Sequence, residues 1–396
     1  MMNEAVMLGD HIELAYGKSL PAAKRRTGAV PVFGSNGQVG THDESAVDGP
    51  GIIVGRKGSV GEVAFSSESF WPIDTTYYVI NKQGHNWRFL YYLLRHSGLT
   101  GLNSHSAVPG LNREDVYSLT GWIPDERTQG RVAEALYFIE RAALAEAEAE
   151  STTQQLKRSI AADLFTRGLR ADALEETEIG PAPATWEVRR LGDDHHIAGG
   201  GTPRRSIPEF WDGGTIPWVK TAEVNYSVIQ STAEHITQAG LDNSSAKLLP
   251  PGTLLIAMFG QGVTRGRVAI LGIEATCNQA CAAVQPLNNR INTRFLYHLL
   301  TNKYNDLRQL AHGGQQQNLN IDIIRGFRVA VPPTCDEQQE IADILDALDR
   351  KINLHRDKKL VLEDIFKALL HGLMSSELSV EDLDLSALPS AEEALV

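Results

Sequence analysis

The sequence is poor in cysteine, has no long apolar run and has no excess of positive charge. Its three cysteines, Cys277, Cys281 and Cys335, are too few for a disulfide framework and fit a reducing, cytoplasmic compartment. No apolar run approaches the roughly 18 residues of a membrane-spanning helix. The first ten residues also lack the basic and apolar segments of a secretory signal. A soluble protein with two or more domains is therefore expected from 396 residues.

The formal net charge of −12 argues against a nucleic-acid partner until its distribution is considered. Residues 376–396 carry six acidic and no basic side chains, which is half of the excess. This composition predicts a disordered tail. Residues 1–124 hold 10 basic and 11 acidic side chains, and residues 185–333 hold 14 and 11, so both segments can present local basic faces.

Catalytic motifs are missing as well. No Asn- or Asp-Pro-Pro-aromatic segment is present to hold the amine of an adenine, and YGKS (16–19) lacks the upstream glycine of a phosphate loop, because Ile12 stands there. CNQAC (277–281) lacks the spacing of a zinc finger, and buried free thiols are expected instead. We therefore expect neither a catalytic residue nor a metal site in this chain.

What the sequence does contain is a long duplication. RFLYYLL (88–94) returns as RFLYHLL (294–300), and PGIIVGRKGSVGEVAF (50–65) parallels PGTLLIAMFGQGVTRGRVAI (251–270). A period of about 200 residues indicates a duplicated domain and not a solenoid repeat. The predicted organisation is a globular domain followed by a long helix, and this unit occurs twice in the chain. The expected segments are a first globular domain at 1–124, a first long helix with its linker at 125–184, a second globular domain at 185–333, a second long helix at 334–375 and the acidic tail at 376–396.

Each globular domain is expected to mix strands and helices, which makes the fold class α+β. Short apolar runs such as GIIVG, TYYVI, GTLLIAM and RVAILG are bounded by glycine, proline and asparagine, as strands are. The RFLYYLL and RFLYHLL segments have the spacing of a helix that packs on a core.

The two long helices carry apolar residues in steps of three and four, which is the seam of a coiled coil. At about 1.5 Å per residue, some 36 residues would give a rod of roughly 54 Å. Neither helix can bury its stripe alone, so we expect the two to pair in an antiparallel coiled coil. His355 and Lys359 fall inside the seam, either at a partly exposed end or as polar positions that fix register. The seam positions are Val132, Leu136, Ile139, Ile160, Leu164, Ile341, Leu345, Leu348, Ile352, Leu362, Phe366 and Leu369.

Two similar domains on a stiff spacer suit a ligand with two separated features, such as a split DNA site, because one turn of B-DNA is about 34–36 Å. Two glycine-rich turns occupy matching places, GRKGSVG (55–61) and GQGVTRG (260–266). Arg and Gln can contact base edges in the major groove. A solvated hairpin tip is the plainer alternative. The candidate DNA-binding residues in these turns are Arg56, Lys57, Ser59, Gln261, Thr264, Arg265 and Arg267.

Two further polar segments are candidates for DNA contact. AHGGQQQNLN (311–320) offers an amide-rich loop, and GTPRRSIPEFW (201–211) with IPWVKTAEV offers a basic and aromatic patch. The candidate residues there are Arg204, Arg205, Lys220, Thr221, Gln315, Gln316, Gln317 and Asn318.

The chain resembles the specificity subunit of Type I restriction–modification systems. The resemblance rests on GGGTPRRSIPEFWDGGTIPWVKTAEV, SSAKLLPPGTLLIAMFGQGVTRGRVAI, CNQACAAVQP and VPPTCDEQQEIADILDALDRKI in the second half, and on VPVFGSNGQVG and GPGIIVGRKGSVGEV in the first. Together these cover about residues 6–373. In the first copy, WIPDERTQGRV departs from the proline-rich entry to the helix that PPTCDEQQEI shows.

The resemblance implies two pseudo-symmetric target-recognition domains, each reading one half of a bipartite, asymmetric site on double-stranded DNA. It implies two modification subunits as partners, which methylate adenine at N6 with S-adenosylmethionine, and restriction subunits that use ATP and Mg. No cofactor is expected in this chain, and no membrane partner. A recognition subunit of another defence assembly and a purely structural coiled-coil protein are the alternatives, separable by sequence-specific, salt-sensitive DNA binding and by co-purification with a methyltransferase.

Overall fold

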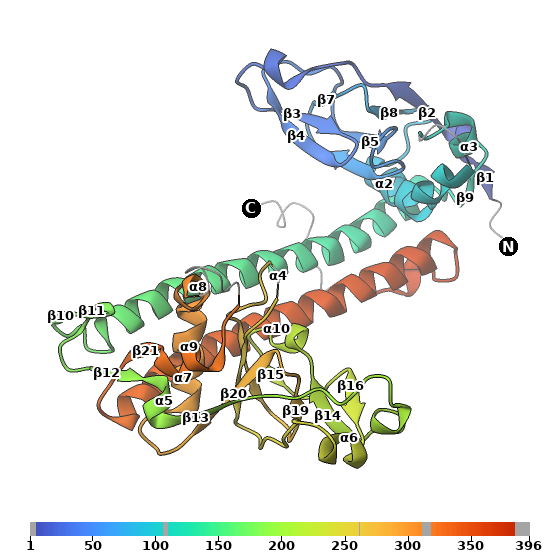
Figure 1. The fold of residues 1–396 in the computed structure, drawn as a ribbon. Helices are drawn as coiled ribbons and strands as arrows, with labels where there is room; N and C mark the ends of the chain where they lie inside the picture. The colour runs from blue at the N-terminus through green and yellow to red at the C-terminus, as the bar shows by residue number, and fades with distance from the viewer. Residues whose placement is uncertain (1–4, 106–109, 261, 311–317, 385–396) are drawn as a thin grey trace. The chain divides into compact units, whose positions relative to one another are not determined.

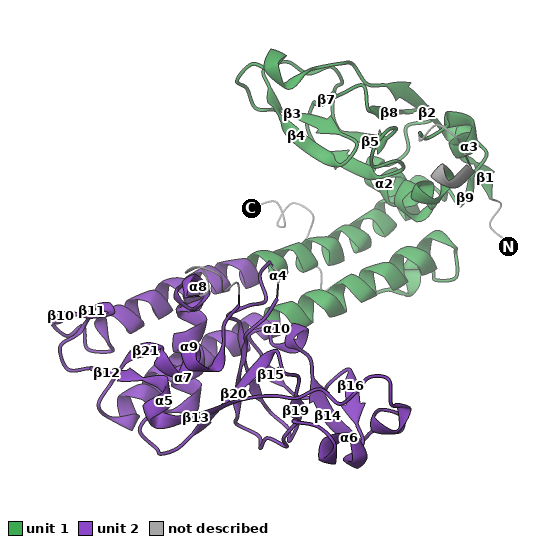
Figure 2. Cartoon of the chain, in the orientation of Figure 1, with its two compact units in different colours: residues 1–148, 355–396 green, residues 149–354 purple. Residues whose placement is uncertain are grey.

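The structure, a computed structural model, describes residues 5–105, 110–260, 262–310 and 318–384 (Figure 1). The chain forms two compact units (Figure 2). Unit 1 comprises residues 1–148 and 355–396, and unit 2 comprises residues 149–354. The long helices α4 (Glu126–Arg167) and α10 (Cys335–Met374) each contribute one part to each unit.

Unit 1 is built on a four-stranded antiparallel sheet with the strand order β2-β8-β5-β6. A second sheet has the order β4-β3-β7, and β1 pairs with β9. The strands are β1 (Val6–Met7), β2 (Ile12–Tyr16), β3 (Val30–Gly34), β4 (Gly37–His42), β5 (Gly51–Gly55), β6 (Val63–Ser66), β7 (Trp71–Pro72), β8 (Thr76–Asn81) and β9 (Thr120–Gly121).

Short helices of unit 1 cover this sheet, and they begin where the sequence supplies caps. Asn86 caps α2 (Trp87–His96) by accepting from the Phe89 N–H, and Asn112 caps α3 (Arg113–Tyr117). The main core joins the strands to α2 and to both long helices, with Phe89, Leu93 and Leu136 all buried there. The other short helices of the unit are α1 (Leu8–His11), η1 (Ala22–Lys24), η2 (Leu99–His105) and η5 (Val380–Asp382).

Unit 2 repeats the plan with the sheet order β13-β20-β17-β18, to which β15 adds a fifth strand. Its second sheet has the order β16-β14-β19, and β12 pairs with β21, as β1 pairs with β9 in unit 1. The strands are β10 (Leu174–Thr177), β11 (Gly180–Pro183), β12 (Glu187–Arg190), β13 (His195–Gly199), β14 (Ile216–Val219), β15 (Val228–Ile229), β16 (Glu234–Ile236), β17 (Leu254–Ala257), β18 (Val268–Leu271), β19 (Thr276–Cys277), β20 (Cys281–Pro286) and β21 (Arg328–Val331).

The helices of unit 2 follow the same order as those of unit 1, and Asn292 and Asn320 cap α7 and α9 as Asn86 and Asn112 cap α2 and α3. The hairpin β10–β11 and the strand β15 are additions relative to the described part of unit 1. The helices are α5 (Leu191–Asp194), η3 (Pro208–Phe210), η4 (Thr221–Glu223), α6 (Gln238–Asp242), α7 (Thr293–Asn302), α8 (Tyr304–Gln309) and α9 (Ile321–Gly326).

The matching strand orders confirm the predicted fold class: two pseudo-symmetric mixed domains joined by two long helices. The predicted strands GIIVG and TYYVI are β5 and β8, and RFLYYLL and RFLYHLL lie in α2 and α7. None of the helices in the described ranges is both long and apolar enough to cross a membrane.

The long helices pack as an antiparallel coiled coil. In unit 1, the start of α4 and the end of α10 share one core, where Val132 and Leu136 lie with Phe366. In unit 2, the end of α4 and the start of α10 share another, where Phe165 lies with Ile341 and Leu345. Of the other predicted seam residues, Ile352 is buried, and Ile139, Ile160, Leu164, Leu348, Leu362 and Leu369 are half-buried.

The polar seam positions have partners within unit 1. His355 Nδ1 lies 2.5 Å from Glu146 Oε2, which joins α10 to α4, and Lys359 pairs with Glu363 on its own helix. Residues 376–384 open the segment expected to be disordered, yet Val380 is buried in the core of unit 1 and its carbonyl accepts a bond from Arg131. This part of the expectation was wrong, because Val380 and Leu383 pack on the core and anchor an otherwise acidic stretch.

Candidate DNA-recognition surfaces

The glycine-rich turn of unit 1 follows β5 and places its cations on the surface. Gly58 and Gly61 have φ angles of +80° and +79°, and a Cβ on Gly61 would lie 2.4 Å from the Leu99 backbone, so the turn requires glycine there. Lys57 is exposed, whereas Ser59 is half-buried. Arg56 is held in place, because its Nη2 donates to the Asp74 carbonyl.

The matching turn of unit 2 follows β17 and brings three of the predicted residues together. Gly262 and Gly266 have φ angles of +78° and +88°. Thr264, Arg265 and Arg267 lie on the turn and are half-buried, and Arg267 donates to Asn225 Oδ1 at 2.7 Å. The predicted contact Gln261 lies outside the described residues.

The predicted basic and aromatic patch of unit 2 forms around Glu234. Arg205 and Lys220 both pair with this carboxylate, and the Arg205 guanidinium lies 3.7 Å from the Trp211 ring centroid and 4.7 Å from that of Trp218. The two cations lower the pKa of Glu234 through their hydrogen bonds and charges. The carboxylate therefore stays ionised and offsets part of the positive charge.

The remaining predicted contacts in unit 2 are distributed differently. Arg204 is exposed beside this patch, and Thr221 donates to Asn278 Oδ1 at 3.0 Å. In the amide-rich loop, Gln315, Gln316 and Gln317 lie outside the described residues, while Asn318 is described and exposed.

Two clusters of tyrosine and arginine, not predicted from the sequence, accompany the turns. In unit 2, the Tyr226 and Tyr304 rings meet edge to face at 6.1 Å, with Arg267 over Tyr226 and Arg308 over Tyr304. The Tyr304 hydroxyl also donates to the Val263 carbonyl in the turn. In unit 1, Arg56 and Arg113 flank Tyr16. Both clusters bring together residues that are distant in sequence, so no local sequence motif predicts them.

One group of titratable side chains in unit 2 has residue types that can bind a metal. His298, Asp346 and Asp349 place potential ligand atoms within 4.8 Å of one another. Asp346 already pairs with Arg294, Asp349 pairs with Lys157 at 2.6 Å, and His298 Nε2 lies 2.7 Å from Asp346. Because both carboxylates are neutralised by cations, this arrangement fits a salt-bridge network better than a metal.

Two of the three cysteines of unit 2 are buried, as predicted for them from the sequence. Cys277 and Cys281 are buried free thiols, and burial raises the pKa of Cys277 to about 12 and that of Cys281 further. Both thiols are therefore expected to stay protonated near neutral pH.

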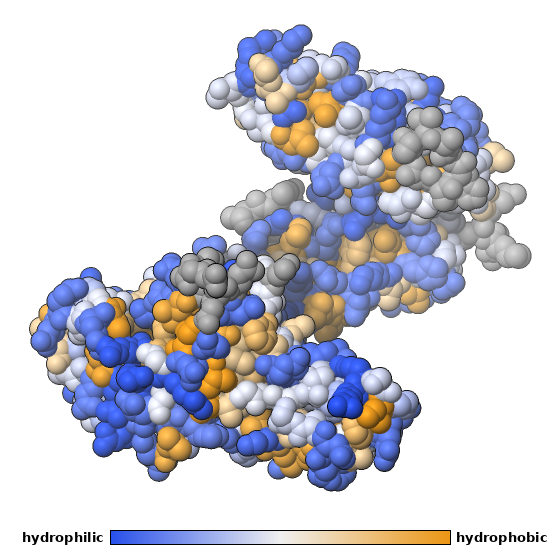
Figure 3. All heavy atoms as spheres, viewed as in Figure 1, coloured by the Kyte–Doolittle hydropathy of each residue, from blue (hydrophilic) through white to orange (hydrophobic). Residues whose placement is uncertain are grey.

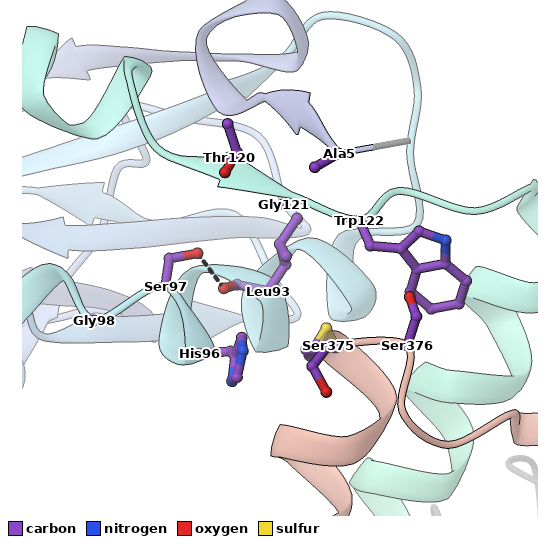
Figure 4. A pocket seen from close by; sticks show the side chains of 11 residues that line it. Ala5, Leu93, His96, Ser97, Gly98, Thr120, Gly121, Trp122, Ser375 and Ser376 are labelled. Atoms are coloured by element: carbon purple, nitrogen blue, oxygen red, sulfur yellow. Dashed lines mark hydrogen bonds between the residues drawn. The ribbon is translucent and has the colours of Figure 1, made fainter. Parts of the chain in front are cut away.

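A depression in unit 1 lies between the end of α2, the strand β9 and the end of α10 (Figure 4). His96, Trp122 and Ser375 line it, and Ser97 donates to the Leu93 carbonyl at its wall. Burial and the neighbouring His371 lower the pKa of His96, so its ring is neutral near pH 7. These side chains form no nucleophile–base pair.

Comparison with known proteins gives these surfaces a context. Residues 3–152 and 183–364 match the family model of the Type I restriction modification DNA specificity domain. The chain belongs to this specificity family. Both copies of the duplication lie within the match, which accounts for the repeated sheet order.

Among curated relatives of the specificity family, the EcoR124I/EcoR124II specificity subunit of Escherichia coli is 31% identical over 170 residues, which is 42% of each chain. The MjaIX specificity subunit of Methanocaldococcus jannaschii is 30% identical over 48% of this chain and 44% of its own length. These alignments therefore span less than half of the relatives concerned.

Solved structures extend the likeness in fold to nearly the whole chain. The S subunit of a Type I restriction-modification system from M. genitalium gives a TM-score of 0.69 at 16% identity, covering 94% of this chain and 96% of that one. A chain from a structural study of Type I R-M complex assembly gives 0.55 at 17% identity, over 93% and 97%.

Proposed function

We propose that this chain reads a bipartite, asymmetric sequence on double-stranded DNA for a Type I restriction–modification complex. Residues 1–124 would read one half-site and residues 185–333 the other. The observation that carries the proposal is a repeated scaffold whose turns after β5 and β17 present different side chains: Arg56 and Lys57 in one, Thr264 and Arg265 in the other. Different side chains on the same scaffold can recognise two different half-site sequences.

We further propose that the chain is not catalytic and recruits partners through its helices. Exposed apolar side chains interrupt the hydrophilic surface of α4 and α10 (Figure 3), and such patches mark protein interfaces. They are Leu144, Leu360, Val361 and Ile365 in unit 1, and Leu156, Ile344 and Leu354 in unit 2. The partners would be two modification subunits that bind S-adenosylmethionine and restriction subunits that use ATP and Mg.

The proposed function is tested by sequencing the methylome of a host with and without the gene. A bipartite motif carrying N6-methyladenine should be present with the gene and vanish without it. A motif that persists, or loss of a short continuous motif, contradicts bipartite reading.

The turn of unit 2 is tested by Arg265→Ala, with the chain co-expressed with its modification subunits. Loss of one base or phosphate contact should weaken binding about 5- to 150-fold at a single half-site, since such contacts contribute about 1–3 kcal/mol. Lys247, an exposed residue of the same unit, provides the control Lys247→Ala. Equal loss of complex assembly would instead give Arg265 a structural role.

The role of the helices is tested by removing four residues from α4 between 149 and 152. One turn less, about 6 Å, should shorten the permitted gap between half-sites. An unchanged gap in the methylated motif would show that the helices do not set it.

A partner surface on α10 is tested by Leu360→Glu, because Leu360 is 52% exposed. Co-purification with the modification subunits should fall, and Val39→Glu, at a 44% exposed position on β4, should leave it unchanged. Loss with both variants would point to general instability.

A further inference from the structure

The exposed ring of Tyr16 stands between two arginines on unit 1. Tyr16 ends β2 and is 52% exposed. The Arg113 guanidinium carbon lies 4.8 Å from its ring centroid and that of Arg56 lies 5.2 Å away. We call these three residues the Tyr16 cluster.

The positive charge of the Tyr16 cluster is not neutralised by its surroundings. Within the described residues, no carboxylate lies within 4 Å of Arg56 or Arg113, unlike Arg205, which pairs with Glu234. The hydrogen bonds of both guanidiniums go to backbone carbonyls: Arg56 to Asp74 and Arg113 to Leu14. Each of these bonds uses one of five donor N–H groups, so both arginines keep donors for an anion.

A layer beneath fixes the Tyr16 cluster in place. Tyr77 is paired with Tyr16 across β2 and β8, and their ring centroids lie 5.1 Å apart. Burial and the neighbouring Tyr16 raise the pKa of Tyr77 to about 12, and its hydroxyl donates to the Leu111 carbonyl at 3.1 Å. The Leu111 N–H donates in turn to the Arg56 carbonyl at 2.9 Å. The cluster is therefore preorganised.

Unit 2 shows that the scaffold does not need the cluster. By strand register, Gly199 and Ala282 stand where Tyr16 and Tyr77 stand in unit 1. Met258 takes the place of Arg56, since its carbonyl accepts from Leu319 as that of Arg56 accepts from Leu111. Ile321, the first residue of α9, corresponds to Arg113, the first of α3.

We propose that the Tyr16 cluster is a DNA contact of unit 1, in which the two arginines bind backbone phosphates and the Tyr16 ring packs on a base or sugar between them. The inference rests on the proposed function and adds residues to it. Arginine prefers phosphate geometry, and an exposed aromatic ring beside arginines is a common surface for nucleotides. Because the equivalent positions of unit 2 carry other residues, this contact would belong to the half-site read by unit 1.

The test uses the complete complex with modification subunits and duplexes carrying the methylated motif. Three duplexes are compared: both half-sites intact, the first scrambled, or the second scrambled. Tyr16→Ala should weaken binding to the intact duplex about tenfold, as expected for a lost stacking contact, while Tyr16→Phe should bind as the wild type does. Arg113→Gln should lower the slope of log affinity against log salt by about one.

The duplex that shows the loss of affinity identifies the half-site that the Tyr16 cluster contacts. Once the half-site read by unit 1 is scrambled, Tyr16→Ala and the wild type should bind alike. Lys82→Ala, just past the opposite end of β8, should bind as the wild type does. Wild-type affinity for both Tyr16→Ala and Arg113→Gln, or losses that appear equally with every duplex, would overturn the inference. A wild-type complex with no preference for the intact duplex would overturn the proposed function itself.

Discussion

The joint between each globular domain and its long helix uses the same positions in the two units but different chemistry. In unit 1, Arg88 lies 3.7 Å from the ring centroid of Tyr137, and Tyr92 donates to Glu140 at 2.9 Å. In unit 2, the corresponding Arg294 and His298 both contact Asp346. An ion pair between Arg95 and Glu140 joins α2 to α4 in unit 1 as well. The scaffold thus specifies where the domain meets its helix, while the side chains that hold the joint differ between the units.

One contact of the joint is unchanged between the units. Gln129 Oε1 accepts from the Asn86 N–H at 2.9 Å, and Gln338 Oε1 accepts from the Asn292 N–H at 2.8 Å. Both amides also donate to a proline carbonyl, that of Pro124 or Pro332. Both glutamines are buried, so each satisfies backbone groups that water cannot reach.

The largest difference between the joints should appear with the same substitution at equivalent positions. Arg294→Met leaves the mostly buried Asp346 with only His298, and should lower the stability of unit 2 by about 2–3 kcal/mol. Arg88→Met removes a contact between a cation and an aromatic ring and leaves no buried charge, so about 0.5–1 kcal/mol is expected in unit 1. Hydrogen exchange of α7 and α2 measures each effect, and equal losses would show that the joints are energetically alike.

The shared glutamine should give matched effects. Gln129→Leu and Gln338→Leu each leave a buried N–H and a buried carbonyl without a hydrogen-bond partner. The free energy of unfolding of the unit concerned should fall by about 1–3 kcal/mol. Hydrogen exchange should therefore show weakened protection of α2 in one variant and of α7 in the other. Gln155→Leu, at an exposed position on α4, serves as the control. A loss confined to one unit would contradict a common joint.

The smallest expected effect is the dependence on pH that His298 gives to the joint of unit 2. Burial lowers the pKa of His298 below its usual 6.5, and the positive Lys157 acts in the same direction, whereas the bond to Asp346 opposes them. Below about pH 6.5 the unfolded chain binds a proton that the folded unit does not, so the free energy of unfolding decreases as the pH falls. Above that pH the effect is absent.

His298→Gln isolates this contribution, because glutamine can still donate to Asp346 and does not titrate. Urea unfolding followed by tryptophan fluorescence between about pH 7.5 and 5.5 should show a shallower decline for the variant. His195, also buried with a lowered pKa, is present in both proteins and cancels in the difference. Identical slopes would exclude His298 as the titrating group.

The architecture could be predicted from the sequence more fully than the DNA-binding surfaces, because the two depend on different kinds of sequence pattern. The repeat of RFLYYLL, the strand runs and the helical seam are local patterns, and the described elements follow them closely. The Glu234 pair and the Tyr16 cluster depend on strand register and on loops that meet in space. The contact of Val380 with the core was missed because six of the nine residues at 376–384 are acidic or polar, so composition alone predicts disorder.

The division of the chain has a consequence for its biosynthesis. Unit 2 is one continuous stretch, residues 149–354, while the core of unit 1 needs Phe366 and Leu373 from the far end of the chain. On the ribosome, the domain that is translated first must therefore wait, with part of its apolar surface uncovered, until the later one has emerged and folded. A nascent chain of this kind would expose its first half to chaperones for most of its synthesis.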